Sequence, residues 1–235
     1  MSPATHSTES PSGVWQGWLQ HPQRMWLHRI CFQIHYGIGV VASFYVALMS
    51  ISGSVIVYRN ELTPRFSVEW LIDLHTRLLA GRTGRSVNGI GALCLVLLCL
   101  TGAVIWWPGI KNWRRSLRVS RGSRIPRLSR DLHSALGFWT YLFVLMWAVS
   151  GLYLVFPDSF SSALAIFDPA DRFYDSALFS LSEAHFGRFG RFTEALWSTL
   201  GLGLALLSIS GVFVCCHRLI NKESSTPNRQ PGIQR

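Results

Sequence analysis

Four of the eight histidines in this 235-residue chain recur at matched intervals. His35 and His133 each precede a Ser-Gly dipeptide, and the interval from histidine to serine is 17 residues in both places. His75 and His185 precede a Thr-Gly and a Ser-Gly dipeptide by 26 and 25 residues, respectively. Neutral imidazole is the commonest metal ligand among protein side chains. The repeated spacing therefore indicates a shared role for these histidines, and metal ligation is the chemistry that suits them.

Four long apolar segments must position these histidines. The chain is 49% apolar and only 14% charged, whereas about a quarter of the residues in an average globular protein are charged. The stretches without Asp, Glu, Lys or Arg are Gly37–Tyr58, Ser86–Ile110, Leu132–Pro157 and Ala195–His217. Each exceeds the roughly 20 residues with which a helix crosses a bilayer. The sequence predicts an all-α integral membrane protein with four spanning helices, and it excludes a soluble domain or a secreted disulfide scaffold.

The four spans repeat as a duplicated two-helix unit. The first and third share one histidine spacing, and the second and fourth share the other. Equivalent helices then run in the same direction, which implies a pseudo-twofold axis along the membrane normal. We expect one four-helix bundle over residues 25–220, because either repeat alone (25–110 or 127–220) leaves its Gly and His face in lipid. Residues 1–24 and 221–235 are expected to be tails, the second of them disordered.

The charge distribution predicts the orientation of the bundle. Residues 1–34, 109–131 and 218–235 carry 14 basic and 3 acidic residues, whereas residues 59–85 and 158–194 carry 8 basic and 9 acidic residues. The positive-inside rule assigns the basic side, and with it both tails, to the cytoplasm. The net charge of +10 is therefore interpreted as a topology signal and a contact for anionic membrane lipid, and nucleic-acid binding is not expected.

This topology places the histidines in pairs at two depths. His35 and His133 lie near the cytoplasmic face, and His75 and His185 lie near the outer face. Iron in a porphyrin takes one axial ligand above and one below the ring, so two opposed imidazoles at each depth predict two bound b-type haems. His217, at the inner end of the fourth span, is a rival ligand for the inner haem.

Two glycines share a helix face with these histidines. Gly53 and Gly151 follow His35 and His133 by 18 residues, which is five whole helical turns and about 27 Å of helix. They therefore reach the depth of the other haem, and we interpret them as positions where a flat macrocycle approaches the backbone. An amphipathic helix over residues 66–80 is expected to lie on the outer surface and to present His75.

Simpler roles at the membrane interface or in helix packing are expected for other side chains. Histidine at a membrane interface is often an amphipathic residue whose tip reaches water, and glycine in a span often serves helix packing. Trp106 and Trp107 are interpreted as interfacial or packing residues. The cations available to haem propionates are Arg77, Arg114, Arg115, Arg188 and Arg191. A metal-ion permease is disfavoured, because transporters place acidic or polar residues in mid-span.

As a set, these motifs resemble the PepSY-associated transmembrane proteins. The shared motifs are the histidine to Ser-Gly spacing, Leu-His-x-x-Leu-Leu-x-Gly at 74–81, Thr-Gly-x-x-x-Trp-Trp-Pro at 101–108 and Arg-Asp-Leu-His at 130–133. The resemblance extends over about residues 25–220. The family includes ferric-siderophore reductases and iron-regulated membrane proteins of the bacterial inner membrane. It implies a dihaem bundle that moves electrons from the cytoplasmic to the periplasmic side, with His35, His75, His133 and His185 as the repeated histidines.

The chain differs from longer members of this family in its first outer connection. Those members carry a sizeable periplasmic domain there, whereas residues 59–85 alone join the first two spans here. We expect electron transfer to a ferric siderophore or to a partner protein, from a donor that the sequence does not identify. No Gly-x-Gly-x-x-Gly fingerprint for a nucleotide cofactor occurs. The alternative is an accessory or structural subunit of a larger respiratory or photosynthetic membrane complex.

Overall fold

The computed structural model describes residues 19–20, 22–63, 67–108, 113–120, 124–166, 174–187 and 189–224. These residues form helices and no strand. The helices long and apolar enough to cross a membrane are α2 (Trp26–Ile56), α5 (Gly81–Trp106), α7 (Ile125–Val155) and α10 (Arg191–Ser224). The predicted all-α membrane fold with four spans is thereby confirmed. Residues 1–18, 21 and 225–235 of the predicted tails lie outside the described part, and α10 continues to Ser224.

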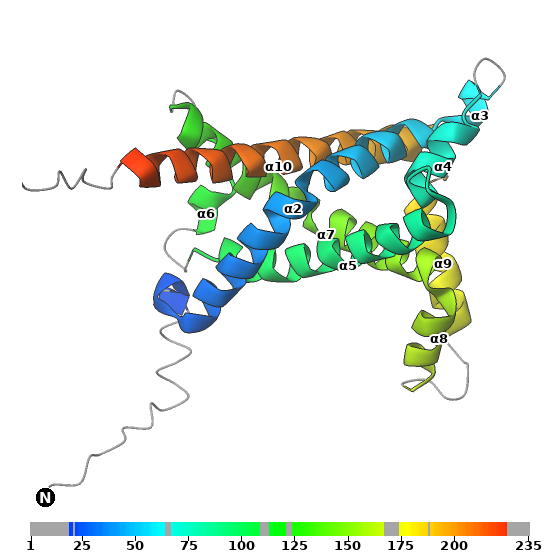
Figure 1. The fold of residues 1–235 in the computed structure, drawn as a ribbon, viewed down its shortest axis with the longest axis horizontal. Coiled ribbons are helices and arrows are strands. Elements are labelled where there is room, and N and C mark those ends of the chain that lie inside the picture. Colours follow the sequence, from blue (N-terminus) through cyan, green and yellow to red (C-terminus); the bar gives the residue numbers. More distant parts are fainter. Residues whose placement is uncertain are drawn as a thin grey trace, which may run out of the picture.

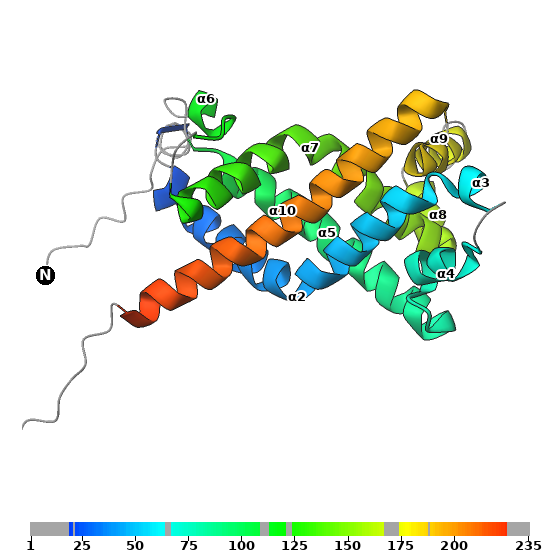
Figure 2. The ribbon, with the colours of Figure 1, turned by 90° about the horizontal axis from the view of Figure 1, so that it is seen from above.

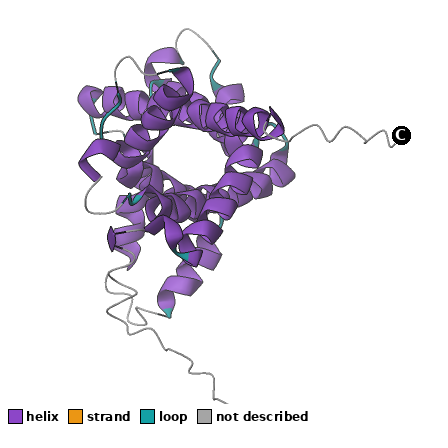
Figure 3. Cartoon of the chain, turned by 90° about the vertical axis from the view of Figure 1, so that its left-hand side faces the viewer, coloured by secondary structure: helices purple, strands orange, loops and turns teal. Residues whose placement is uncertain are grey.

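The four long helices form a ring. α2 packs against α5 and α10, and α7 packs against the same two helices from the opposite side. The end-on view in Figure 3 shows the helices arranged around a common centre. The two first helices of the repeats, α2 and α7, therefore lie diagonally opposite each other, and so do α5 and α10. This arrangement is what a twofold relation between two copies of a two-helix unit requires.

Short helices lie at the two ends of the ring. The end at which α2 begins and α10 finishes is called the terminal end; it also holds η1 (Pro22–Arg24) and α6 (Trp113–Ser116). The opposite end is called the loop end, and its short helices are α3 (Arg59–Leu62), α4 (Glu69–Arg77), α8 (Pro157–Ala165) and α9 (Tyr174–Phe186). Figure 2 shows the same separation from above. Helix α4 falls inside the segment for which an amphipathic surface helix was predicted.

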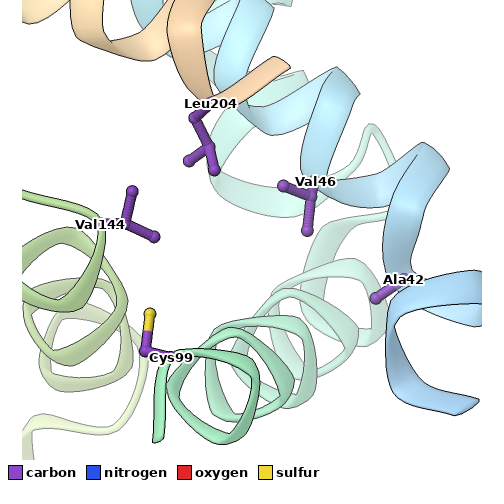
Figure 4. Packing of buried hydrophobic residues seen from close by; sticks show 5 residues of the cluster. All are labelled: Ala42, Val46, Cys99, Val144 and Leu204. Carbon is purple, nitrogen blue, oxygen red and sulfur yellow. The ribbon is translucent and has the colours of Figure 1, made fainter. Parts of the chain in front are cut away.

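A small aliphatic cluster fills the centre of the bundle. It consists of Ala42 and Val46 from α2, Cys99 from α5, Val144 from α7 and Leu204 from α10, and Figure 4 shows these side chains turned toward one another. Along α2 the cluster lies between His35 and Gly53. Every spanning helix contributes at least one of its members, so this cluster joins the two repeats and separates the two ends of the bundle with apolar side chains.

The connection from α4 to α5 reverses sharply. Leu78 and Leu79 both adopt left-handed backbone angles, with φ of 51° and 56°. The first turn of α5 then lies directly on the end of α4, where a Cβ added at Gly84 would overlap the carbonyl oxygen of Arg77. Glycine at this position is therefore what allows the two helices to approach so closely.

Replacing Gly84 by alanine is expected to destabilise the protein. The obstacle is backbone rather than a flexible side chain, so the hairpin must open, and such overpacking costs about 1–3 kcal/mol. The measurement is thermal unfolding of the purified protein in detergent. Gly37→Ala in α2 is the matched control, because no atom lies within 4 Å of a Cβ placed there. Equal melting temperatures for the two variants would contradict this account of the turn.

Candidate functional site

The structure brings the four repeated histidines together as two pairs. His35 of α2 faces His133 of α7 near the terminal end, with ring centroids 6.4 Å apart and ring planes at 81°. His75 of α4 and His185 of α9 form the loop-end pair, and His75 contributes to the lowered pKa of His185. Each pair takes one histidine from each repeat, in the pairing that the sequence predicted.

Each imidazole is held through Nδ1 by an oxygen on a neighbouring helix. The bonds join His35 to Thr101 Oγ1 (3.1 Å), His75 to Ser52 Oγ (2.9 Å), His185 to Ser150 Oγ (2.7 Å) and His133 to the Leu207 carbonyl (2.9 Å) and Ser210 Oγ (3.3 Å). The hydroxyl partners belong to four Ser/Thr-Gly pairs: Ser52-Gly53, Thr101-Gly102, Ser150-Gly151 and Ser210-Gly211. The Ser/Thr-Gly dipeptides that recur in the sequence thus supply hydroxyl groups that contact the histidines directly.

The direction of these hydrogen bonds follows from what else the hydroxyl groups do. Ser150 Oγ donates its proton to the Met146 carbonyl at 2.6 Å. Thr101 and Ser52 likewise donate to carbonyls of their own helices, at 2.6 and 3.2 Å. With its proton used in this way, each hydroxyl can only accept from the imidazole. The carbonyl oxygen at His133 can also only accept, so in all four rings Nδ1 carries the proton.

This tautomer leaves the other ring nitrogen, Nε2, with a free lone pair. A histidine that binds a metal ion through one nitrogen almost always donates the other N–H to a fixed oxygen, which orients the ring and raises its basicity. All four histidines therefore share the Nδ1-bonded arrangement that is common among metal-binding histidines, which leaves Nε2 as the nitrogen that could act as a ligand.

The glycines of the Ser/Thr-Gly pairs make room for the same rings. A Cβ would lie 3.0 Å from His75 Cε1 at Gly53, 3.7 Å from His185 at Gly151, 3.2 Å from His35 at Gly102 and 3.0 Å from His133 at Gly211. The 18-residue spacing thus placed Gly53 and Gly151 at the loop-end level. An imidazole ring lies against each of these glycines, and the approach of a flat macrocycle there stays a prediction.

Each repeat holds its own two histidines. In the first repeat, Ser52 of α2 bonds His75, and in the second repeat, Ser150 of α7 bonds His185. The hydrogen bonds are therefore made within a repeat, whereas the histidine pairs are made between repeats. Docking of the two repeats is what brings the opposed imidazoles together.

Comparison with known families identifies the region that contains these features. A family model described as the PepSY-associated TM region matches residues 63–168. Residues 63–168 are thus similar to the PepSY-associated TM region. This confirms the resemblance seen in the sequence, over a segment that begins before α4 and ends beyond α8. The PepSY-associated region includes one histidine of each pair, His75 and His133.

One curated protein also resembles this chain. The uncharacterized protein PA4219 of Pseudomonas aeruginosa is 31% identical over 88 residues, which make up 36% of this chain and 21% of that protein. The chain thus matches about a fifth of the length of this relative. No solved structure matches the chain.

Two side chains hold the backbone that carries the loop-end histidines. In the PepSY-associated region, Asn88 donates from Nδ2 to the carbonyls of His75 (2.9 Å) and Thr76 (3.2 Å), and it accepts the hydroxyl proton of Tyr45 at 2.6 Å. In the second repeat, Trp197 donates from Nε1 to the carbonyl of Ala184, next to His185, at 2.8 Å. Asn88 lies 14 positions before Gly102, and Trp197 lies 14 positions before Gly211. Sequence comparison of the repeats missed this equivalence because the residue types differ.

The surroundings keep the loop-end imidazoles neutral. Burial lowers the pKa of His75 to about 4. Burial, with a smaller contribution from His75, lowers the pKa of His185 to about 4. Both rings therefore carry no charge at pH 7, which is the form that ligates metal ions.

Each pair offers two ligands and no more. Among the described residues no group of three or more His, Cys, Asp or Glu side chains could hold a metal ion. A bare zinc ion takes at least three protein ligands, whereas iron in a porphyrin takes only the two axial ones. Since a metal–imidazole bond is about 2 Å long, two rings on opposite sides of one metal ion have centres about 6 Å apart. The terminal-end pair fits this requirement.

The other predicted site residues lie elsewhere. His217 lies on α10 six residues beyond Gly211, which at 100° per residue is a different face of the helix. Arg77, Arg114 and Arg191 are exposed, and Arg77 pairs with Asp73 at 3.6 Å. Arg188 and the side chain of Arg115 lie outside the described part.

Removing the Asn88 side chain is expected to loosen α4 and with it His75. Asn88→Ala leaves the carbonyls of His75 and Thr76 without this donor, and it leaves the Tyr45 hydroxyl with only the backbone carbonyl of residue 88 (3.1 Å), a loss of about 1–3 kcal/mol. Hydrogen–deuterium exchange over α4, together with thermal unfolding in detergent, measures the effect. Asn60→Ala on the exposed surface of α3 is the control. Unchanged exchange in the Asn88 variant would show that this network does not position the histidine.

Proposed function

We propose that this membrane protein binds two b-type haems and carries electrons from one side of the bilayer to the other. The single observation that supports this most is the recurrence, at both ends of one bundle, of paired histidines whose Nδ1 atoms are bonded to oxygens and whose Nε2 atoms have no hydrogen bond among the described residues. The PepSY-associated TM region suggests a membrane protein of the iron-regulated or ferric reductase-like kind.

The residues divide into ligands and positioning groups. His35 and His133 hold one haem, and His75 and His185 hold the other, each as axial ligands through Nε2. The serine and threonine hydroxyls and the Leu207 carbonyl fix the rings and raise their basicity through Nδ1. Bound in this way, haem supplies one-electron redox chemistry at its iron.

The bundle separates the two sites along the membrane normal. The 18 residues from His35 to Gly53, beside His75, correspond to about 27 Å of helix. The aliphatic cluster between them keeps water out of the centre. An apolar core with a site near each face suits electron passage without a path for ions or protons.

We further propose that the terminal end faces the cytoplasm of a bacterium with the protein in its inner membrane, since the excess of basic residues lies there. Electrons then enter at the His35 and His133 site and leave at the His75 and His185 site. The acceptor is a periplasmic iron complex such as a ferric siderophore, or a partner protein.

The decisive experiment is a reduced-minus-oxidised absorption spectrum of the purified protein with haem quantification. We expect b-type bands and two haems per chain. His133→Ala is expected to retain one haem, because the loop-end pair stays intact. His28→Ala, at the start of α2 and outside both pairs, and His217→Ala should retain two. A protein purified without haem from haem-replete cells defeats the proposal and favours an accessory role in a membrane complex.

The hydroxyl groups are expected to tune the loop-end haem. In the double variant Ser52→Ala, Ser150→Ala, each imidazole loses its hydrogen-bond acceptor and becomes a less basic ligand. Ferric iron is then less stabilised, so the midpoint potential of that haem rises while the other stays unchanged. A potentiometric titration that is monitored by haem absorption measures the midpoint potentials of both haems.

The control for this variant is Ser54→Ala. Ser54 is buried beside the same Ser/Thr-Gly pair, but its hydroxyl donates to the Ser50 carbonyl at 2.7 Å. Equal shifts in the control and the double variant would contradict a specific role for the Nδ1 hydrogen bonds.

A further inference from the structure

Two neighbouring tryptophans at the terminal end of α5 bury polar atoms without a partner. The indole nitrogens of Trp106 and Trp107 are buried, and neither has a hydrogen-bond partner among the described residues. A buried indole N–H normally finds an acceptor, because leaving it unpaired is costly. Interfacial tryptophans direct this group toward water and headgroups, whereas these two indole nitrogens are buried. Their burial therefore indicates a missing acceptor.

The end of α5 explains how the indole nitrogens of adjacent residues can both be buried. Trp106 is the last residue of α5, and Trp107 is extended, with φ of −63° and ψ of 108°. The residue before a proline is disfavoured in helical conformation, so Pro108 ends the helix here. Trp107 thus leaves the helical spiral, in which successive side chains diverge by 100°.

The two tryptophans lie at the end of the bundle that holds His35 and His133. Trp106 follows Gly102 by four residues, about one helical turn, and Gly102 lies against His35. The Trp106 ring also stacks on Phe138 of α7, with centroids 4.5 Å apart and planes at 26°. Helix α7 is the one that carries His133. Trp106 therefore lies about one helical turn beyond the glycine that contacts His35, at the end of the bundle where the proposed function places a haem, and Trp107 is its neighbour in the chain.

We propose that the indole N–H groups of Trp106 and Trp107 donate hydrogen bonds to the propionate carboxylates of the haem held by His35 and His133. This inference rests on the proposed function. Carboxylate oxygens are strong acceptors that suit buried N–H donors. Both propionates are attached to the same edge of the porphyrin, so hydrogen-bond donors are needed only at that edge. The equivalent positions of α10 are Cys215 and Cys216, which offer no comparable donor.

The test compares haem retention in Trp106→Phe and Trp107→Phe with that of the wild-type protein. Phenylalanine keeps an aromatic ring and removes the N–H. Transfer of haem from the purified holoprotein to excess apomyoglobin is expected to be about tenfold faster at the terminal-end site. Trp139→Phe is the control, because Trp139 is 65% exposed on α7 and should leave the rate unchanged.

A second measurement separates hydrogen bonding from packing. Protein reconstituted with haem dimethyl ester, which has no carboxylates, should lose haem at the same rate in the wild type and in both variants. A persistent difference with the ester would assign the tryptophans to packing and overturn the inference. If phenylalanine disrupts folding, benzothienylalanine at position 106 keeps the bicyclic shape and replaces the N–H by sulfur, and the same acceleration is expected.

The outcomes distinguish this inference from the proposed function. Two haems per chain with unchanged release in both variants would overturn the tryptophan contacts and leave the dihaem proposal standing. A wild-type protein without haem would overturn both.

Discussion

The arrangement of the four histidines depends on one recurring contact. In it, a histidine Nδ1–H donates a hydrogen bond to the hydroxyl of a Ser/Thr-Gly pair or to a carbonyl of the helix that carries the pair. The hydroxyl is available as an acceptor because its proton already satisfies a carbonyl of the preceding turn. The adjacent glycine removes the Cβ that would otherwise press on the ring. Two small residues thus fix the position, tautomer and exposed nitrogen of one imidazole. Since the contact occurs four times, the chemistry of both sites is set by the same local geometry.

Duplication turns this local contact into paired sites. Within each repeat the hydrogen bonds hold two histidines near opposite ends of a helix, yet a single repeat offers only one imidazole at each level. Packing of α2 and α7 against both α5 and α10 brings the second imidazole opposite the first. Site formation is therefore coupled to the burial of the aliphatic cluster that joins the repeats. A change that separates the repeats should weaken both sites together.

The two repeats have diverged around this shared frame. Asn88 and Trp197 hold the backbone beside the loop-end histidines from equivalent positions with different chemistry. At the terminal end, α5 finishes at two tryptophans whose indole nitrogens are buried, where α10 continues with two cysteines. His133 alone bonds a backbone carbonyl as well as a hydroxyl. Such differences give the two levels distinct surroundings.

The sequence by itself determined the four spans, the duplication and the pairing of His35 with His133 and His75 with His185, because hydropathy and periodic spacing are local properties of the chain. The level of Gly53 and Gly151 also followed from helix periodicity. Only the tertiary structure decided which groups face those glycines and which oxygen binds each Nδ1. It also decided where the nitrogens of Trp106 and Trp107 lie. These features depend on the rotation and close approach of helices distant in sequence, and side-chain spacing along one helix does not specify them.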